Sequence, residues 1–190
     1  MTLTEGTKVR ALREARGLLQ TFGFNGFSFQ HIADLLGIKK PSLYDHFKSK
    51  EELGLNLIES YQLMFKDWAE TIEIFEAKEK VGAFFEVMFK FACSDGKICP
   101  MSSLVTDYHS LPKSMKKNVI KMFDFQKDWL KGVIEEGQKK KVFRKDSSSE
   151  DLAELVISIG WGCQLISRVM ESPDNIKTAK IQALRALEAK

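Results

Sequence analysis

The sequence predicts an all-α protein. Apolar residues recur at three- and four-residue steps along nearly the whole chain, as they do on one face of an α-helix. No segment keeps the strict alternation of a half-buried strand. Pro100, Pro112 and Pro173 stand at boundaries between helical stretches, where proline is tolerated. We therefore expect about nine helices, three in a small N-terminal domain (residues 1–50) and the others in a larger helical bundle (51–190).

The composition is that of a soluble globular protein, with 44% hydrophobic and 29% charged residues. No apolar run approaches the roughly 20 residues that span a bilayer, and the N-terminus lacks a signal-peptide core, so we expect a cytoplasmic protein without a membrane partner. The three cysteines lack close C-x-x-C spacing. This pattern argues against a disulfide framework or a structural zinc site, and no cofactor is expected.

The positive charge is concentrated at the N-terminal end. Residues 1–50 carry eight Lys and Arg against four acids, a balance of +4, whereas the rest of the chain carries 21 against 22, a balance of −1. Such asymmetry indicates an anionic polymer as the partner of the N-terminal domain.

The first two helices follow from their stripes and caps. An apolar stripe through 9–22 predicts the first, and Gly23 and Gly26 end it. Ser28 is a natural N-cap for the second helix, over 29–36, and Gly37 suits its left-handed C-cap.

Pro41 fits the first turn of a third helix of about seven residues, in which Leu43 and Phe47 face inward. Ser49 then opens a long fourth helix that continues through Trp68. Five further helices are expected at about 77–93, 100–109, 113–139, 148–170 and 174–189.

Two short helices joined by a tight glycine turn, and braced by a preceding helix, predict a helix-turn-helix. With Leu43 and Phe47 packed inward, the polar residues of the third helix would face outward on a rod that fits the major groove of B-DNA. Lysines, hydroxyls and an imidazole would reach phosphates, and side chains early in the helix would reach base edges. The predicted DNA-binding residues are Ser28, Lys39, Lys40, Pro41, Ser42, Tyr44, His46 and Lys50.

The stretch GFNGFSFQHIADLLGIKKPSLYDHFKSKEEL, residues 23–53, resembles the DNA-binding motif of the TetR/AcrR family of bacterial transcriptional regulators. The resemblance implies that Tyr44, His46 and Lys50 contact the DNA backbone. It also implies that Lys39, Pro41 and Ser42 lie nearest the bases. Lys39 and Pro41 replace residues usual in that family, so no operator sequence can be carried over. The matching positions are Ile32, Ala33, Gly37, Ile38, Lys40, Leu43, Tyr44, His46, Phe47, Ser49, Lys50, Glu51 and Leu53.

The same resemblance implies that the larger domain binds a small-molecule effector and forms a homodimer. Effector cavities are mostly apolar with a few polar groups, although aromatic residues at helical spacing also suit a plain core. The candidate ligand-binding residues are Trp68, Phe85, Phe89, Met101, Val105, His109, Phe125, Trp129, Trp161 and Gln164.

A dimer would place two recognition helices about 34–36 Å apart on a palindromic site. The last two helices carry more apolar surface than one helix face buries, and they are the predicted dimer interface. Its candidate residues are Leu152, Leu155, Val156, Ile159, Gly162, Ile166, Ile181 and Leu184.

The leading hypothesis is a homodimeric repressor that a small-molecule inducer releases from a palindromic operator on double-stranded DNA. One alternative is a regulator that senses oxidants or electrophiles through Cys99, because a helix N-terminus lowers a thiol pKa. A cysteine-dependent enzyme using Cys99 and His109 lacks a recognisable orienting residue and oxyanion loop, so no enzyme is predicted. A DNA-binding architectural protein without a ligand is a further alternative.

Overall fold

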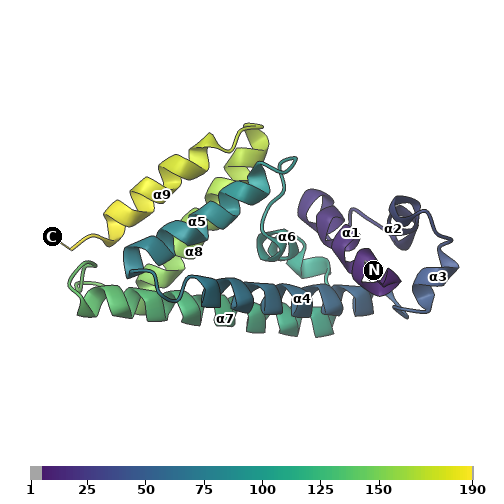
Figure 1. Cartoon of the computed structure of the whole chain (residues 1–190), viewed down its shortest axis with the longest axis horizontal. Coiled ribbons are helices and arrows are strands. Elements are labelled where there is room, and N and C mark those ends of the chain that lie inside the picture. The colour runs from purple at the N-terminus through teal and green to yellow at the C-terminus, as the bar shows by residue number, and fades with distance from the viewer. Residues whose placement is uncertain (1–5, 190) are drawn as a thin grey trace, which may run out of the picture. The chain divides into compact units, whose positions relative to one another are not determined.

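The computed structural model describes residues 6–189 and confirms the all-α fold (Figure 1). Within this range lie nine α-helices, one 3₁₀ helix and no named strand, with an isolated bridge between Phe143 and Glu188. Residues 1–5, where no signal-peptide core was found, lie outside the described residues.

The helices follow the predicted order. They are α1 (Thr7–Phe22), α2 (Phe29–Leu36), α3 (Pro41–Tyr44), α4 (Lys50–Thr71), α5 (Ala77–Ala92), α6 (Pro100–Thr106), η1 (Tyr108–Ser110), α7 (Lys113–Lys139), α8 (Ser149–Val169) and α9 (Asp174–Leu187).

Two helices differ from their predicted lengths. The third helix was expected to span about seven residues, but α3 has four. The amides of His46 and Phe47 both donate to Leu43 O, at 3.1 and 2.9 Å, so a tightened turn completes the segment. The predicted helix at 100–109 is divided at Asp107, whose φ of −93° and ψ of 3° lie outside the helical region.

The chain forms two compact units. Unit 1 comprises Met1–Met64 and Pro100–Ile120, and unit 2 comprises Phe65–Cys99 and Lys121–Lys190. Unit 1 therefore takes in α6 and η1, which are distant from its N-terminal helices in the sequence. The predicted functional division between residues 50 and 51 stays a prediction.

The core of unit 1 forms where α6 packs against α1. Most of α6 is buried, including Met101 and Leu104. The hydroxyl of Ser103 donates to Leu19 O at 2.6 Å, so this buried polar side chain is satisfied inside the core. On its own side of the core, α1 also packs against α2. The buried residues of these two helices are Ala11, Ala15, Leu19, Phe29, Ile32, Ala33 and Leu36.

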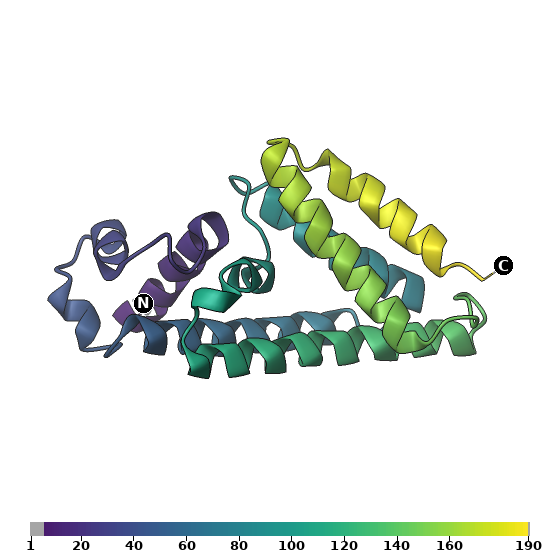
Figure 2. The ribbon, with the colours of Figure 1, turned by 180° about the vertical axis from the view of Figure 1, so that it is seen from behind.

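In unit 2, α5, α8 and α9 pack side by side (Figure 2). Gly160 allows the close approach of α5 and α8, because a Cβ atom there would lie 2.8 Å from Met88 Sδ. Lys80 is 6% exposed, and its ammonium donates to Glu136 at 2.9 Å. The buried charge of α5 is thus paired with a carboxylate of α7.

By length and composition alone, α8 could cross a membrane. Core helices of soluble proteins meet the same criteria, and α8 packs against both α5 and α9.

Candidate nucleic-acid interface

The second helix is fixed by caps at both ends. Its N-cap is Ser28, whose amide donates to Nδ1 of His31 at 3.3 Å, so a histidine takes the place that Glu or Gln has in a capping box. At the other end, Gly37 has a φ of 65°. The amide of Gly37 donates to Asp34 O at 3.3 Å and that of Ile38 to Ala33 O at 3.0 Å, which is a Schellman motif. These bonds set where the chain leaves α2 for α3.

The third helix has the predicted orientation. Leu43 and Phe47 are each 1% exposed, whereas Tyr44 is 50% exposed. The Tyr44 ring lies 5.0 Å from that of Phe29, measured between centroids. A helix too short to be stable alone is therefore held by two buried anchors and one ring contact.

A continuous exposed run lies at the start of α3. Lys39, Lys40, Pro41 and Ser42 are all exposed, and His46 and Ser28 are half-buried. Among the described residues, Lys39 and Lys40 form no ion pair with a carboxylate. This surface has donors and positive charge without an internal partner, which is what a phosphate-bearing duplex requires.

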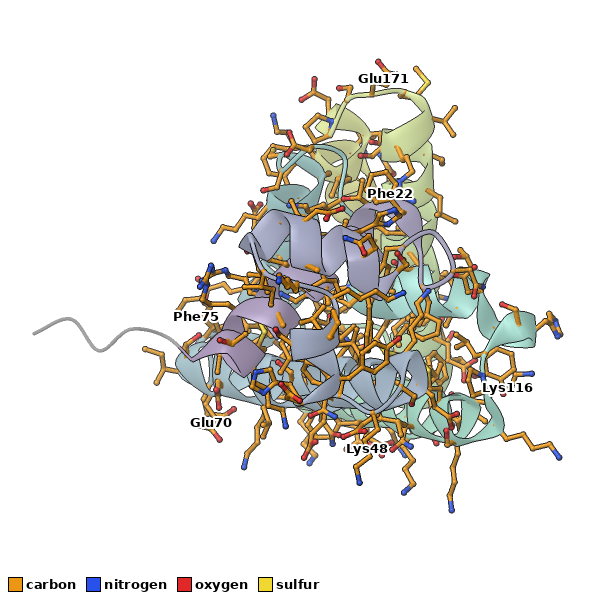
Figure 3. The ribbon with its side chains drawn as sticks, turned by 90° about the vertical axis from the view of Figure 1, so that its right-hand side faces the viewer. Phe22, Lys48, Glu70, Phe75, Lys116 and Glu171 are labelled. Carbon is orange, nitrogen blue, oxygen red and sulfur yellow. The ribbon has the colours of Figure 1, made fainter. Side chains whose placement is uncertain are left out.

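Lys48 was not among the predicted contacts. It is exposed, and Figure 3 shows its side chain extending outward from the surface. The available signal was its position two residues before Lys50, the first residue of α4. The helical pattern did not show that this loop faces outward.

Lys50 is placed differently from the other predicted contacts. Its ammonium donates to Phe27 O and lies 4.7 Å from the ring centroids of both Phe24 and Phe27. Burial lowers the pKa of Lys50, and the nearby charge of Asp107 opposes that shift. The ammonium is thus engaged within unit 1, and a phosphate contact from it stays a prediction.

The predicted effector residues are brought together only in part. The ring centroids of Trp68 and Trp129 lie 5.2 Å apart. The ring of Phe65, which was not among the predicted residues, contacts both of these rings and that of Phe125. These four side chains form an aromatic cluster in unit 2.

The other candidates in unit 2 have separate neighbours. Trp161 packs on Phe123, with 5.8 Å between ring centroids. Gln164 is fully buried and accepts a hydrogen bond from the amide of Cys99 at 3.2 Å. Phe85 is also fully buried, and Lys177 lies over the ring of Phe89.

Three candidates belong to unit 1 and not to the aromatic cluster. Met101 is fully buried, whereas Val105 and His109 are exposed. A shared site for all ten residues stays a prediction.

The predicted dimer face needs one correction. Leu152 and Val156 are 4% and 0% exposed, because their side of α8 packs into the core of this chain. They have no surface left for a partner. Leu155, Ile166 and Ile181 are 39%, 55% and 48% exposed.

The outer surface of α8 and α9 is hollowed. An open hollow of about 470 Å³ is lined by residues of both helices. Ile159, Gly162 and Ile166, all predicted interface residues, line it together with Ser158, Cys163, Asn175, Thr178 and Ala179. Leu184 is half-buried.

The thiols are mostly buried. Cys99 is 3% exposed, so it lacks the solvent access of a reactive thiol. Burial raises the pKa of the Cys163 thiol to about 11. Cys93 is exposed. Within residues 6–189, no three His, Cys, Asp or Glu side chains form a group suited to a metal ion.

Comparison with known proteins relates both parts of the chain to one class of regulator. Residues 11–56 match the bacterial regulatory proteins of the tetR family, and residues 77–183 match the tetracyclin repressor-like C-terminal domain. The HTH-type transcriptional repressor DhaR of Mycobacterium sp. (strain GP1) is 26% identical over 170 residues, which cover 85% of this chain and 84% of DhaR.

Solved structures show the same fold. A TetR transcriptional regulator from Legionella pneumophila is 30% identical with a TM-score of 0.89, and the match covers 99% of this chain and 100% of that one. A TetR-family regulator from Agrobacterium tumefaciens has a TM-score of 0.90 at 22% identity, covering 96% and 97% of the two chains. At that identity, the second likeness concerns the fold alone.

Proposed function

Because the chain belongs to the TetR family of bacterial transcriptional regulators, we propose that it is a cytoplasmic homodimeric repressor that a small molecule releases from a palindromic operator. Its homologues and structural neighbours are regulators and not enzymes. The observation that carries the proposal is the exposed run Lys39–Ser42 mounted on the buried anchors Leu43 and Phe47.

In this proposal α3 enters the major groove of the duplex. Lys39, Pro41 and Ser42 meet base edges, and Pro41 can offer only an apolar contact, such as one with a thymine methyl. Lys40, Tyr44 and His46 contact phosphates on either side, and the exposed Lys48 adds a further phosphate contact. Ser28 directs the N-terminal amides of α2 at another phosphate.

The dimer is proposed to form through the outer surface of α8 and α9. Leu155, Ile166 and Ile181 are apolar and exposed there, and they continue into Leu165, Val169 and Met170, which are 41%, 82% and 66% exposed. A contiguous apolar surface of this kind suits a second copy related by a two-fold axis. That symmetry would match a palindromic duplex.

The effector is proposed to bind in unit 2 near the aromatic cluster of Phe65, Trp68, Phe125 and Trp129, which suits an apolar or aromatic guest. Release requires only that the guest bind two conformers of the dimer unequally. The relative DhaR is named a repressor, which supports the same sign of regulation here. The burial of Cys99 gives the thiol-sensing alternative no support.

Selection of bound duplexes from a random DNA pool tests the proposal. We expect enrichment of a palindrome whose half-sites are separated by about one helical turn or a multiple of it. Enrichment of an asymmetric site would refute the symmetric dimer on DNA, and no enrichment at all would refute operator binding.

A further inference from the structure

We propose that Asp107 is a positioning residue for the DNA-binding surface. Its carboxylate holds the turn Gly23–Ser28, between α1 and α2, in the conformation that presents α2 and α3. The structural part of this inference concerns unit 1 alone, and its consequence for DNA rests on the proposed function.

The carboxylate satisfies two successive main-chain amides of the turn. Oδ2 of Asp107 accepts a hydrogen bond from Phe24 N at 2.6 Å and from Asn25 N at 3.3 Å. Both amides lie just beyond the end of α1, where the helical bonding pattern has stopped. Hydrogen bonds to a carboxylate are stronger than those between neutral groups, so this contact fixes the exit of α1.

A second pair of bonds comes from the same short segment. The side-chain amide of Asn25 donates to Ser110 Oγ at 2.7 Å, and the Ser110 hydroxyl donates to Asp107 O at 2.7 Å. The segment 107–110, which consists of η1 and its N-cap Asp107, thus contacts the turn Gly23–Ser28 through both Asp107 and Ser110. Two contacts restrict rotation of the turn more than one contact would.

The contact of Asp107 with the amides of Phe24 and Asn25, called the Asp107 clamp below, also requires a glycine at position 23. Its φ of 79° favours glycine, and a Cβ atom there would lie 2.8 Å from Asp107 Oδ2. The carboxylate therefore occupies the space into which a side chain at Gly23 would extend.

Lys50, the first residue of α4, contacts the same turn. Its ammonium donates to Phe27 O and packs on the rings of Phe24 and Phe27, which are 5% and 3% exposed. Asp107 thus binds the beginning of the turn and Lys50 its end.

The position of the turn determines the position of the DNA-binding surface. The N-cap Ser28 directly follows Phe27, and Phe29 of α2 contacts the Tyr44 ring of α3. A shift of the turn therefore moves α2 and, through that ring contact, α3. The segment that supplies Asp107 is peptide-bonded to unit 2 at both ends, at Cys99–Pro100 and at Ile120–Lys121.

The test compares Asp107→Ala and Asp107→Asn with the parent, and uses Asp124→Ala, an exposed position on α7, as the matched control. Amide hydrogen exchange is measured first on the free protein. In Asp107→Ala we expect peptides covering 23–28 and 38–48 to exchange at least about tenfold faster, because local opening becomes easier. Asp107→Asn keeps an acceptor oxygen but loses the charge, so its exchange rates should lie between those of Asp107→Ala and the parent. Asp124→Ala should match the parent.

DNA binding is measured next, on a duplex selected by the parent and on a random-sequence duplex. Asp107→Ala should lose at least about tenfold in affinity for the selected duplex and less than about threefold for the random one, because base contacts depend on orientation more than phosphate contacts do. Asp107→Asn should keep more of the preference for the selected duplex than Asp107→Ala does, because it retains an acceptor oxygen. A purely structural role would lower both affinities in proportion to the unfolded fraction seen in a thermal melt.

Unchanged exchange at 23–28 in Asp107→Ala would overturn the clamp. Faster exchange with an unchanged preference between the duplexes would overturn the positioning role. A parent protein that prefers no duplex refutes the proposed function and the positioning role with it, while the exchange result still decides the clamp.

Discussion

At the scale of single residues, the lysines of unit 1 divide into two groups by what surrounds them. Lys40 is exposed, whereas the ammonium of Lys50 is held by Phe27 O and two rings. We therefore expect Lys40 to contribute to DNA binding and Lys50 to contribute to the stability of unit 1.

Lys40→Ala and Lys50→Ala form a matched pair of variants. Lys40→Ala should reduce the salt slope of DNA binding by about one and leave the thermal melt nearly unchanged. Lys50→Ala should lower the free energy of unfolding by about 1–3 kcal/mol, because Phe27 O loses its charged donor. Salt titration and chemical denaturation measure the two effects. A reduced salt slope in Lys50→Ala with unchanged stability would assign Lys50 to a phosphate instead.

The pairing of Lys80 with Glu136 makes stability depend on pH. Hydrogen bonds from Lys80, and then from Lys140, lower the pKa of Glu136 below its ordinary value of 4.5. The unfolded chain binds this proton more readily, so the contribution is present above pH 4.5 and is lost as the pH falls through the lowered folded-state pKa.

Glu136→Gln should lower the free energy of unfolding at neutral pH by about 1–2 kcal/mol, because the buried Lys80 ammonium loses its counter-charge. The variant should also lose less stability than the parent below pH 4.5. Glu70→Gln, which removes an exposed pair with Lys66 at 4.0 Å, is the control and should cost less than about 0.5 kcal/mol. Urea titrations at several pH values give both quantities. Parallel pH profiles for parent and Glu136→Gln would contradict the linkage.

At the scale of helices, glycines inside α7 and α8 face different surroundings. A Cβ at Gly160 would meet Met88 and Phe84, whereas a Cβ at Gly132 would have no atom of another segment within 4 Å. Gly160→Ala should therefore destabilise the protein by about 1–2 kcal/mol through overpacking. Gly132→Ala should stabilise it by about 0.5–1 kcal/mol through helix propensity. Thermal melts measure both effects. Midpoints that shift in the same direction in the two variants would contradict the packing described at Gly160.

The outer surface of α8 allows a direct test of the proposed dimer. Ile166→Glu places a charge at a 55% exposed apolar position, which should yield monomers that keep their helical content but lose affinity for the selected palindrome. Ile74→Glu changes a residue that is 91% exposed and outside α8 and α9, and it should leave the association unchanged. Sedimentation velocity measures the mass. Dimers persisting in Ile166→Glu would place the interface elsewhere.

At the scale of the whole molecule, local features were predictable from the sequence and long-range ones were not. The caps at Ser28 and Gly37, and the inward faces of Leu43 and Phe47, depend on neighbours a few residues away. The contact of Asp107 with Phe24 joins positions 83 residues apart in the sequence, so no pattern among neighbouring residues predicts it.

The predicted interface on α8 stays a prediction for its exposed residues, because apolar residues extend over more than one face of that helix. Periodicity cannot decide which face meets the core of the same chain, so Leu152 and Val156 were misplaced. The effector residues show the same difficulty, since an aromatic side chain fits a cavity wall and a solid core equally well.

The discontinuous make-up of unit 1 predicts that its N-terminal part cannot fold fully by itself. A fragment ending at Met64 lacks Leu104 and Met115, which are 1% and 0% exposed, and it lacks the Asp107 clamp. Its circular dichroism should show reduced helicity and a broad, weakly cooperative melt compared with the intact chain. A sharp transition in the fragment would show that residues 100–120 are dispensable for unit 1.

The same interleaving has a consequence for synthesis on the ribosome. The helices that we propose to contact DNA are translated early, yet unit 1 is complete only when the chain has been made up to Ile120. At about 5–20 residues per second, the interval between residues 64 and 120 lasts on the order of 3–11 seconds. During that interval the nascent chain lacks α6, which packs against α1 in the finished protein, so we expect apolar side chains of α1 to remain accessible to chaperones.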